Sequence, residues 1–167
     1  MHYTLAVLVQ NEAGVLNRVT SLFRRRQFNI DSLTVSMTES PDVSRITVTF
    51  QGDEGSKVQL MSQLYKLPVV VNILELDSDN AVSRELLLIK MANDPETREA
   101  IHTAVSAFEA KIVDYARDSM IIQLTGGSRR LDNFINVMRD YTILEICRTG
   151  VVALERGGST IKTSRSL

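Results

Sequence analysis

The stretch Asn11-Glu12-Ala13-Gly14-Val15-Leu16 separates a short apolar run, residues 5–9, from an amphipathic segment that begins about Val15. The run is rich in strand formers and too short for a typical helix, so it predicts a β-strand. After the loop, apolar residues recur on one face of a helix, at positions 15, 16, 19, 22 and 23. A glycine in such a turn lets a ligand approach the backbone, and a helix start presents unpaired N–H groups and positive dipole charge. The stretch therefore predicts a strand–loop–helix unit that can bind a carboxylate.

A second element, Phe28-Asn29-Ile30-Asp31-Ser32-Leu33, follows the same helix and returns the chain to a strand. A free amino acid needs donors for its carboxylate and acceptors for its ammonium group. The side-chain oxygens of Asn11 and Asn29 can supply the acceptors, and the donors are the backbone N–H groups of Gly14, Val15 and Leu16. Four apolar residues would enclose a branched side chain: Val15, Leu16, Ile30 and Val35. We therefore predict a sensor of valine, leucine or isoleucine.

Further elements follow from the spacing of apolar residues. Alternation predicts strands over residues 30–38 and 44–51, with a turn at 39–42 between them. Helical spacing predicts a second helix that ends near Tyr65, and a last strand follows over 69–76. The order of elements is βαββαβ.

The same order returns after a polar segment, residues 77–80. Two ferredoxin-like βαββαβ domains in tandem, an α+β fold, account for nearly the whole chain. We expect a first domain over 1–77, a second over 78–156, and a polar, disordered tail over 157–167. The expected elements of the second domain are a strand at 85–91, a helix at 101–108, strands at 111–117 and 120–125, a helix at 131–138 and a strand at 143–154.

The composition is that of a globular protein, with 44% apolar and 23% charged residues. A formal net charge of −1 and a pI of about 6.1 imply no basic surface for nucleic acid. No apolar run reaches the roughly 20 residues that a membrane-spanning helix needs. Cys147 is the only cysteine, which excludes an internal disulfide, and we interpret it as a small buried hydrophobe. No signal peptide is recognised, so we expect a cytoplasmic protein with no nucleic-acid or membrane partner.

Other candidate sites have weaker patterns. The basic run at 24–26 closes a helix, where cations favour the dipole, and we interpret it as structural. Gly126-Gly127-Ser128 lacks the lysine of a phosphate-binding loop, so a turn with Ser128 as the helix cap is favoured. His2 and His102 have no partner at metal-ligand spacing. We predict no metal site and no catalytic site.

The size of each unit favours self-association. A unit of about 75 residues buries only about 60% of its unfolded surface and is marginal alone. We expect the strand over residues 3–9 to lie at a sheet edge, where its few charges would not discourage pairing. The sequence therefore predicts a homodimer with the first domains side by side.

Three strings carry a resemblance to a known family: Asn11–Val19, Phe23–Val35 and Ser44–Val48. They are similar to the small regulatory subunit of acetolactate synthase, also called acetohydroxyacid synthase, whose first half is an ACT domain. The resemblance continues through Ser83–Lys90, which opens the second unit, and Arg148–Leu154, which closes it. It covers nearly the full length and is more specific than a generic ACT pattern.

This resemblance implies a subunit without chemistry of its own. In the family, the large catalytic subunit carries thiamine diphosphate, magnesium and FAD, and it condenses two pyruvates or pyruvate with 2-oxobutyrate. The small subunit activates it and makes it sensitive to valine, as part of branched-chain amino-acid biosynthesis. The family's effector lies between two ACT domains, and the matching positions are Asn11, Gly14, Val15 and Leu16 of one protomer with Asn29 and Ile30 of the other.

The alternatives fit the loops less well. The second unit has Ala92–Thr97 in place of the glycine loop, so we expect no second effector site there. A small ferredoxin-like enzyme such as an acylphosphatase needs a phosphate-binding arginine in the first loop, and residues 10–15 contain none. An ACT-type transcription regulator needs a DNA-binding element, and neither the charge nor the pattern indicates one.

Overall fold

The computed structural model describes residues 1–25 and 28–163. Its contacts divide the chain into two compact units. Residues 1–83 and the chain from Val151 onward form the first unit, and residues 84–150 form the second.

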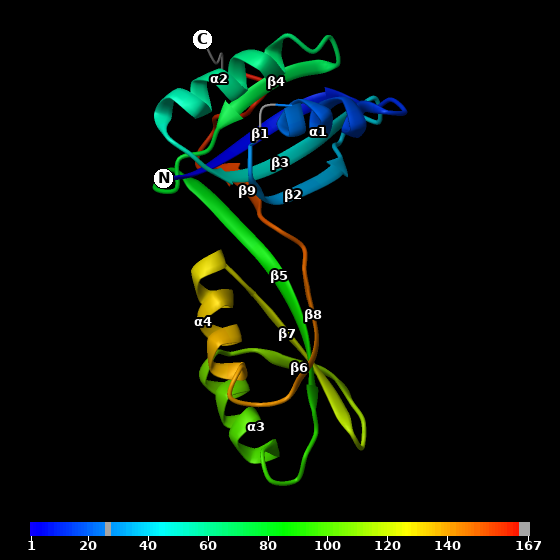
Figure 1. Ribbon diagram of the computed structural model, residues 1–167, viewed down its shortest axis with the longest axis vertical. Helices are drawn as coiled ribbons and strands as arrows, with labels where there is room; N and C mark the ends of the chain where they lie inside the picture. The colour runs from blue at the N-terminus through cyan, green and yellow to red at the C-terminus, as the bar shows by residue number, and fades with distance from the viewer. Residues whose placement is uncertain (26–27, 164–167) are drawn as a thin grey trace. The chain divides into compact units, whose positions relative to one another are not determined.

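The first unit contains a four-stranded antiparallel sheet in the order β2-β3-β1-β4. This arrangement confirms the predicted βαββαβ order. Its elements are β1 (His2–Gln10), α1 (Val15–Arg25), β2 (Ile30–Met37), β3 (Val43–Gln51), α2 (Glu54–Tyr65) and β4 (Val70–Glu75) (Figure 1). The predicted end of the first helix includes Arg26, which lies outside the described residues.

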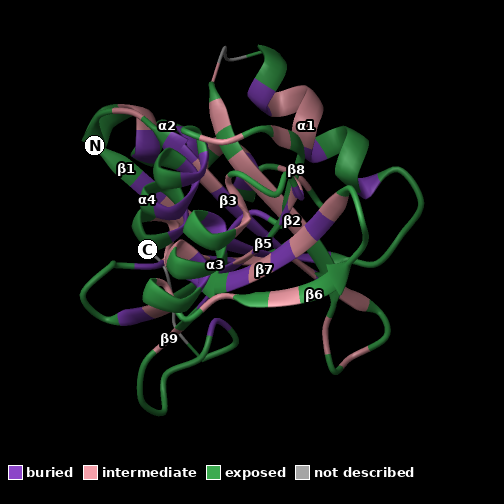
Figure 2. Cartoon of the chain, turned by 90° about the horizontal axis from the view of Figure 1, so that it is seen from below, coloured by how far each residue is buried: buried purple, intermediate pink, exposed green. Residues whose placement is uncertain are grey.

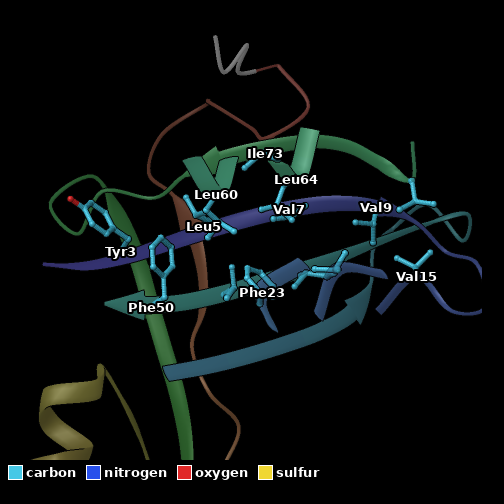
Figure 3. Packing of buried hydrophobic residues seen from close by; sticks show 14 residues of the cluster. Tyr3, Leu5, Val7, Val9, Val15, Phe23, Phe50, Leu60, Leu64 and Ile73 are labelled. Carbon is cyan, nitrogen blue, oxygen red and sulfur yellow. The ribbon is translucent and has the colours of Figure 1, made fainter. Parts of the chain in front are cut away.

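Both helices of this unit cover one face of the sheet. Alternate residues of β1 and β3 point into this core, where they meet the buried stripes of α1 and α2 (Figure 3). The stripe of α1 is Val15, Val19 and Phe23, and Figure 2 shows buried stretches along this helix between exposed ones. Each fully buried side chain of this kind contributes about 2 kcal/mol, so the core holds the first loop between two fixed elements.

The other face of the first sheet is covered by the C-terminal part of the chain. Ala6 and Leu8 of β1 form a second buried cluster there with three residues from beyond the second unit: Val151, Ala153 and Ile161. The short strand β9 (Val152–Glu155) pairs with β5. This cover corrects the expected domain limits, because residues 151–156 belong with the first unit.

The expected disordered tail is also corrected in part. Ile161 is 6% exposed because it packs on the apolar second face of the sheet. The expectation of disorder is therefore wrong for 157–163, and residues 164–167 lie outside the described part of the chain.

The second unit repeats the plan, with strands in the order β6-β7-β5-β8. Its core packs alternate residues of β5 and β7 against α3 and α4. Its elements are β5 (Ala81–Ala92), α3 (Arg98–Ala107), β6 (Lys111–Tyr115), β7 (Ser119–Gly126), α4 (Ser128–Met138) and β8 (Ile143–Arg148). The second βαββαβ unit is thus confirmed.

Two predictions about strands are wrong. β1 lies between β3 and β4, so the edges of the first sheet are β2 and β4. Both faces of β1 are buried, which is the environment that a continuous apolar run favours. The single strand expected over 143–154 is two strands, β8 and β9, and Gly150 between them has a positive φ of 79°.

Two local predictions in the second unit are also corrected. Cys147 is exposed, because it pairs with Leu88 on the sheet face away from the helices. The N-cap of α4 is Gly127, and the Ser128 hydroxyl donates instead to the carboxylate of Glu85. The sequence pattern could not show that Glu85, which is 43 residues away, would take that hydroxyl.

Glu85 forms a buried ion pair that joins three elements of the second unit. It is 4% exposed and accepts from Nε of Arg148 at 2.9 Å and from Nη2 at 2.8 Å. Nη1 of Arg148 lies 2.6 Å from Asp132 of α4. These hydrogen bonds raise the pKa of Arg148 despite partial burial, which lowers it.

Within residues 1–25 and 28–163, no helix is long and apolar enough to cross a membrane. The same residues contain no group of three His, Cys, Asp or Glu side chains that could hold a metal ion.

Replacing Arg148 tests the buried ion pair. Arg148→Ala leaves the Glu85 carboxylate buried without its guanidinium, and we expect a loss of about 3 kcal/mol in the free energy of unfolding. Urea titration of the full chain measures this, with Arg117→Ala in the exposed β6–β7 turn as the matched control. Equal effects of the two substitutions would show that the pair does not stabilise the unit.

Candidate functional site

The loop after β1 is tied to the β2–β3 turn by Asn11. Its backbone N–H donates to the carbonyl of Asp42 at 2.8 Å, and its side-chain Nδ2 donates to the carbonyl of Pro41 at 2.9 Å. The hydroxyl of Ser44 donates to Oδ1 of Asn11 at 3.1 Å. The side chain predicted to accept from an ammonium group therefore already positions the loop, although an amide oxygen can accept a second hydrogen bond.

Gly14 is required by its backbone conformation. Its φ is 83°, and a Cβ added there would meet nothing within 4 Å. An L-residue would be strained at this φ, yet it would not clash, so the loop is open on this side.

The start of α1 offers backbone donors beside this open side. The N–H of Val15 donates to the carbonyl of Glu12 at 3.3 Å, and that of Arg18 donates to Gly14 at 3.1 Å. The N–H groups of residues 16 and 17 belong to the first turn of α1, whose donors have no acceptor within the helix. A carboxylate at this point would receive hydrogen bonds and favourable dipole charge.

The predicted apolar lining is divided between core and surface. The side chain of Val15 is 6% exposed and packs in the core, so only its backbone faces the loop. Leu16 is 43% exposed, and Val35 and Met37 on the β2 edge are 41% and 71% exposed. These three exposed side chains are the apolar surface that a ligand or a second chain could cover.

Asn29 and Ile30 lie at the opposite end of the sheet from the glycine loop. Ile30 begins β2 and pairs with Phe50, near the start of β1. The glycine loop follows the end of β1, beside Met37 at the end of β2. The eight residues of β2 span about 25 Å, so one copy of the chain cannot bring the two halves of the predicted site together.

The second unit has an asparagine in the equivalent place, which sequence reasoning missed. The N–H of Asn93 donates to Asp118 at 3.0 Å, and its Nδ2 donates to Ala116 at 2.7 Å, in the β6–β7 turn. Superposing the two βαββαβ patterns would have revealed this repeat, since each asparagine directly follows the first strand of its unit. The same side chain therefore fixes the corresponding loop in both units.

In the second unit, the side chain of Arg98 fills the loop before α3. Nε of Arg98 donates to Oδ1 of Asn93 at 2.7 Å, and Nη2 donates to its backbone carbonyl at 3.0 Å. Of the two equivalent loops, only the first has a glycine with positive φ before its helix.

Comparisons with known proteins agree in both halves of the chain. The family model described as "AHAS small subunit-like ACT domain" matches residues 5–72, and that of "Small subunit of acetolactate synthase" matches residues 84–157. A probable acetolactate synthase small subunit of Archaeoglobus fulgidus is 47% identical over 94% of this chain and 98% of its own. The acetolactate synthase small subunit of Bacillus subtilis is 41% identical over 94% of this chain and 92% of its own.

A solved structure matches over nearly the same length. The crystal structure of the acetolactate synthase small subunit from Thermotoga maritima has a TM-score of 0.88 and 38% identity, and the match covers 95% of this chain and 99% of that one. The similarity thus includes both units.

The two asparagines offer a matched test of loop positioning. Asn11→Ala removes side-chain hydrogen bonds of a partly exposed loop, and we expect a loss of about 1 kcal/mol in the free energy of unfolding. Asn93→Ala removes those of a side chain that is 2% exposed, and we expect a loss of about 2–3 kcal/mol. Urea titration compares the two, and faster hydrogen exchange at residues 11–14 should appear only in Asn11→Ala. Unchanged exchange there would mean that Asn11 does not position the loop.

Proposed function

Because the chain belongs to the family of acetolactate synthase small subunits, we propose that it activates the large catalytic subunit and makes it sensitive to feedback inhibition by valine. As a regulatory subunit with an ACT domain, it acts through a partner that performs the chemistry. Thiamine diphosphate, magnesium and FAD are expected on the large subunit, and this chain is proposed to carry none of them. A cytoplasmic location stays a prediction.

The separation of the two half-sites along β2 supports a dimeric effector site. β2 is an edge strand with one charged residue, Asp31, so its outer edge is suited to pair with a second chain. Antiparallel pairing of β2 with its copy around a two-fold axis reverses one strand relative to the other. The start of the copy's β2 then lies beside the end of this β2.

This pairing would complete the predicted site. Asn29 and Ile30 of the second copy come next to the loop that contains Asn11 and Gly14, because that loop lies at the end of β2. The same pairing covers Val35, which is 41% exposed in one copy. Two equivalent sites result, each built from both chains.

The chemistry of this composite site suits valine. Its carboxylate would bind the N–H groups at the start of α1, next to Gly14. Its ammonium group would meet the amide oxygen of Asn29 from the second copy and the remaining lone pair on Oδ1 of Asn11. Leu16 and Ile30 would pack against the branched side chain. The proposed site thus uses the residues predicted from the sequence, of which Asn11 and Val15 also serve the fold of the loop.

An effector at this position acts by linkage. Valine bound between two copies favours the dimer in which both half-sites meet. It inhibits only as far as it binds the inhibited state of the complex more tightly than the active state. The proposed site therefore couples effector binding to the arrangement of two small subunits on the catalytic partner.

A charge on the β2 edge should disrupt the proposed dimer. Val35→Asp places a carboxylate on the apolar β2 edge that the second copy is proposed to cover, and we expect dimerisation to weaken by about tenfold or more. Val71→Asp is the matched control, because Val71 is 55% exposed on the other edge strand, β4. Sedimentation velocity over a range of concentrations measures both. A dimer that survives Val35→Asp but dissociates with Val71→Asp would place the interface on β4.

A charge in the glycine loop should remove valine inhibition. Gly14→Asp sets a carboxylate against that of the effector, whereas Gly14→Asn imposes the same positive-φ strain without the charge. We expect Gly14→Asp to weaken valine inhibition by at least about tenfold, and Gly14→Asn to retain most of it, with activation intact in both. Acetolactate formation is measured with the matching large subunit alone, with each small subunit, and with valine added.

The assay separates the two parts of the proposal. No stimulation by the unmodified chain would contradict the activating role. Stimulation that valine reverses equally in Gly14→Asp and the unmodified chain would contradict the assigned site.

A further inference from the structure

A cavity of about 440 Å³ lies on the second face of the first sheet, under the C-terminal segment. This volume is in the range of small-ligand sites in proteins. Leu8 and Leu74 of the sheet supply its apolar floor, and Ile161 of the segment supplies an apolar wall. The cavity belongs to the first unit alone.

Two side chains of the sheet hold the C-terminal segment by hydrogen bonds, and both belong to one row of residues that runs across three strands. Arg45, Leu8 and Asn72 are paired neighbours across β3, β1 and β4. Nη2 of Arg45 donates to the carbonyl of Ala153 at 2.7 Å, and Nδ2 of Asn72 donates to the carbonyl of Ile161. The chain between these two contacts arches over Leu8, which leaves the cavity beneath it.

Arg45 brings a positive charge into this cavity without a carboxylate partner. No ion pair joins Arg45 to any Asp or Glu in the described part of the chain. Burial lowers the pKa of Arg45, as expected for a guanidinium that is partly removed from water. Its bond to the neutral carbonyl of Ala153 leaves most of its five N–H donors available.

Glu155 brings the opposite charge. It lines the same cavity, and its Oε2 is buried with no hydrogen-bond partner among the described residues. The other charged pair of the lining, Glu39 and Lys162, is satisfied within itself. Arg45 and Glu155 therefore both line this cavity, and no ion pair among the described residues neutralises either of them, which is costly for partly buried charges unless a ligand supplies the counter-charges.

We propose that this cavity binds a small zwitterion, an α-amino acid with an apolar side chain. Its carboxylate pairs with Arg45, its ammonium group pairs with Glu155, and its side chain packs on Leu8 and Leu74. The residues proposed to contact this ligand are separate from those of the proposed effector site, because Leu8, Arg45 and Leu74 lie on the second face of one copy's sheet and Glu155 lies in the segment that covers that face.

Methyl NMR of the full-length chain can observe both sites independently. The probe is L-leucine, titrated to millimolar concentration. Shifts at Leu8, Leu74 and Ile161 report the cavity, whereas shifts at Leu16 and Ile30 report the proposed effector site. Two analogues complete the series: isopentylamine lacks the carboxylate, and 4-methylpentanoate lacks the ammonium group.

We expect saturable shifts at the three cavity residues with L-leucine, and affinity about tenfold weaker for each analogue, since each loses one charge-assisted contact. Glu155→Gln and Arg45→Gln should weaken leucine binding there by a similar factor. The controls Glu96→Gln and Arg117→Gln change exposed residues of the second unit and should leave binding unchanged.

Glu155→Gln also separates binding from a structural role. Oε2 of Glu155 has no partner in the described chain, so the substitution should leave the melting temperature unchanged or raise it. Absent cavity shifts with L-leucine, an affinity in the two substituted chains equal to that of the unmodified chain, or binding of 4-methylpentanoate as tight as that of L-leucine would each overturn the proposal. Shifts at Leu16 and Ile30, whether present or absent, do not affect this result.

Discussion

The antiparallel strand order β2-β3-β1-β4 is the constraint on which the first unit depends. It buries β1 at the centre and leaves β2 and β4 as edges. It also places the glycine loop beside the end of β2, and Asn29 before its start. A site that uses both Gly14 and Asn29 then requires two copies of the chain, so the proposed effector site and the proposed dimer depend on each other.

A second constraint follows because both helices of this unit lie on one face of the sheet. The apolar residues on the other face need a cover, and the C-terminal segment provides it with Val151, Ala153 and Ile161. In the second unit, Leu88 and Cys147 remain exposed on the corresponding face. The two units also differ in the loop before their first helix. In the second unit, Arg98 donates a hydrogen bond to the side-chain oxygen of Asn93, whereas the loop of the first unit has an open turn at Gly14. The repeat thus has one loop with an open turn, where the effector site is proposed, and one loop closed by its own side chain.

Much of the fold follows from local patterns. Apolar spacing over a few residues predicted the order of helices and strands in both units, and the loop with Gly14 was recognised from its place between a strand and a helix. The errors concern partners that are distant in the sequence. β1 was expected at an edge, Ser128 was expected to cap its own helix, and Cys147 was expected to be buried.

The sequence by itself determined the family and the two βαββαβ units, because family motifs are contiguous and secondary structure follows the spacing of apolar residues. It also supplied the residues proposed for the effector site. Only the tertiary structure decided which strands are edges, which end of the sheet each half-site occupies, and where the C-terminal segment packs. The contact of Arg45 with Ala153 joins residues 108 positions apart, and no local pattern encodes it. Periodicity reports which face of an element is apolar, whereas the partner that covers this face is selected by packing of the whole chain.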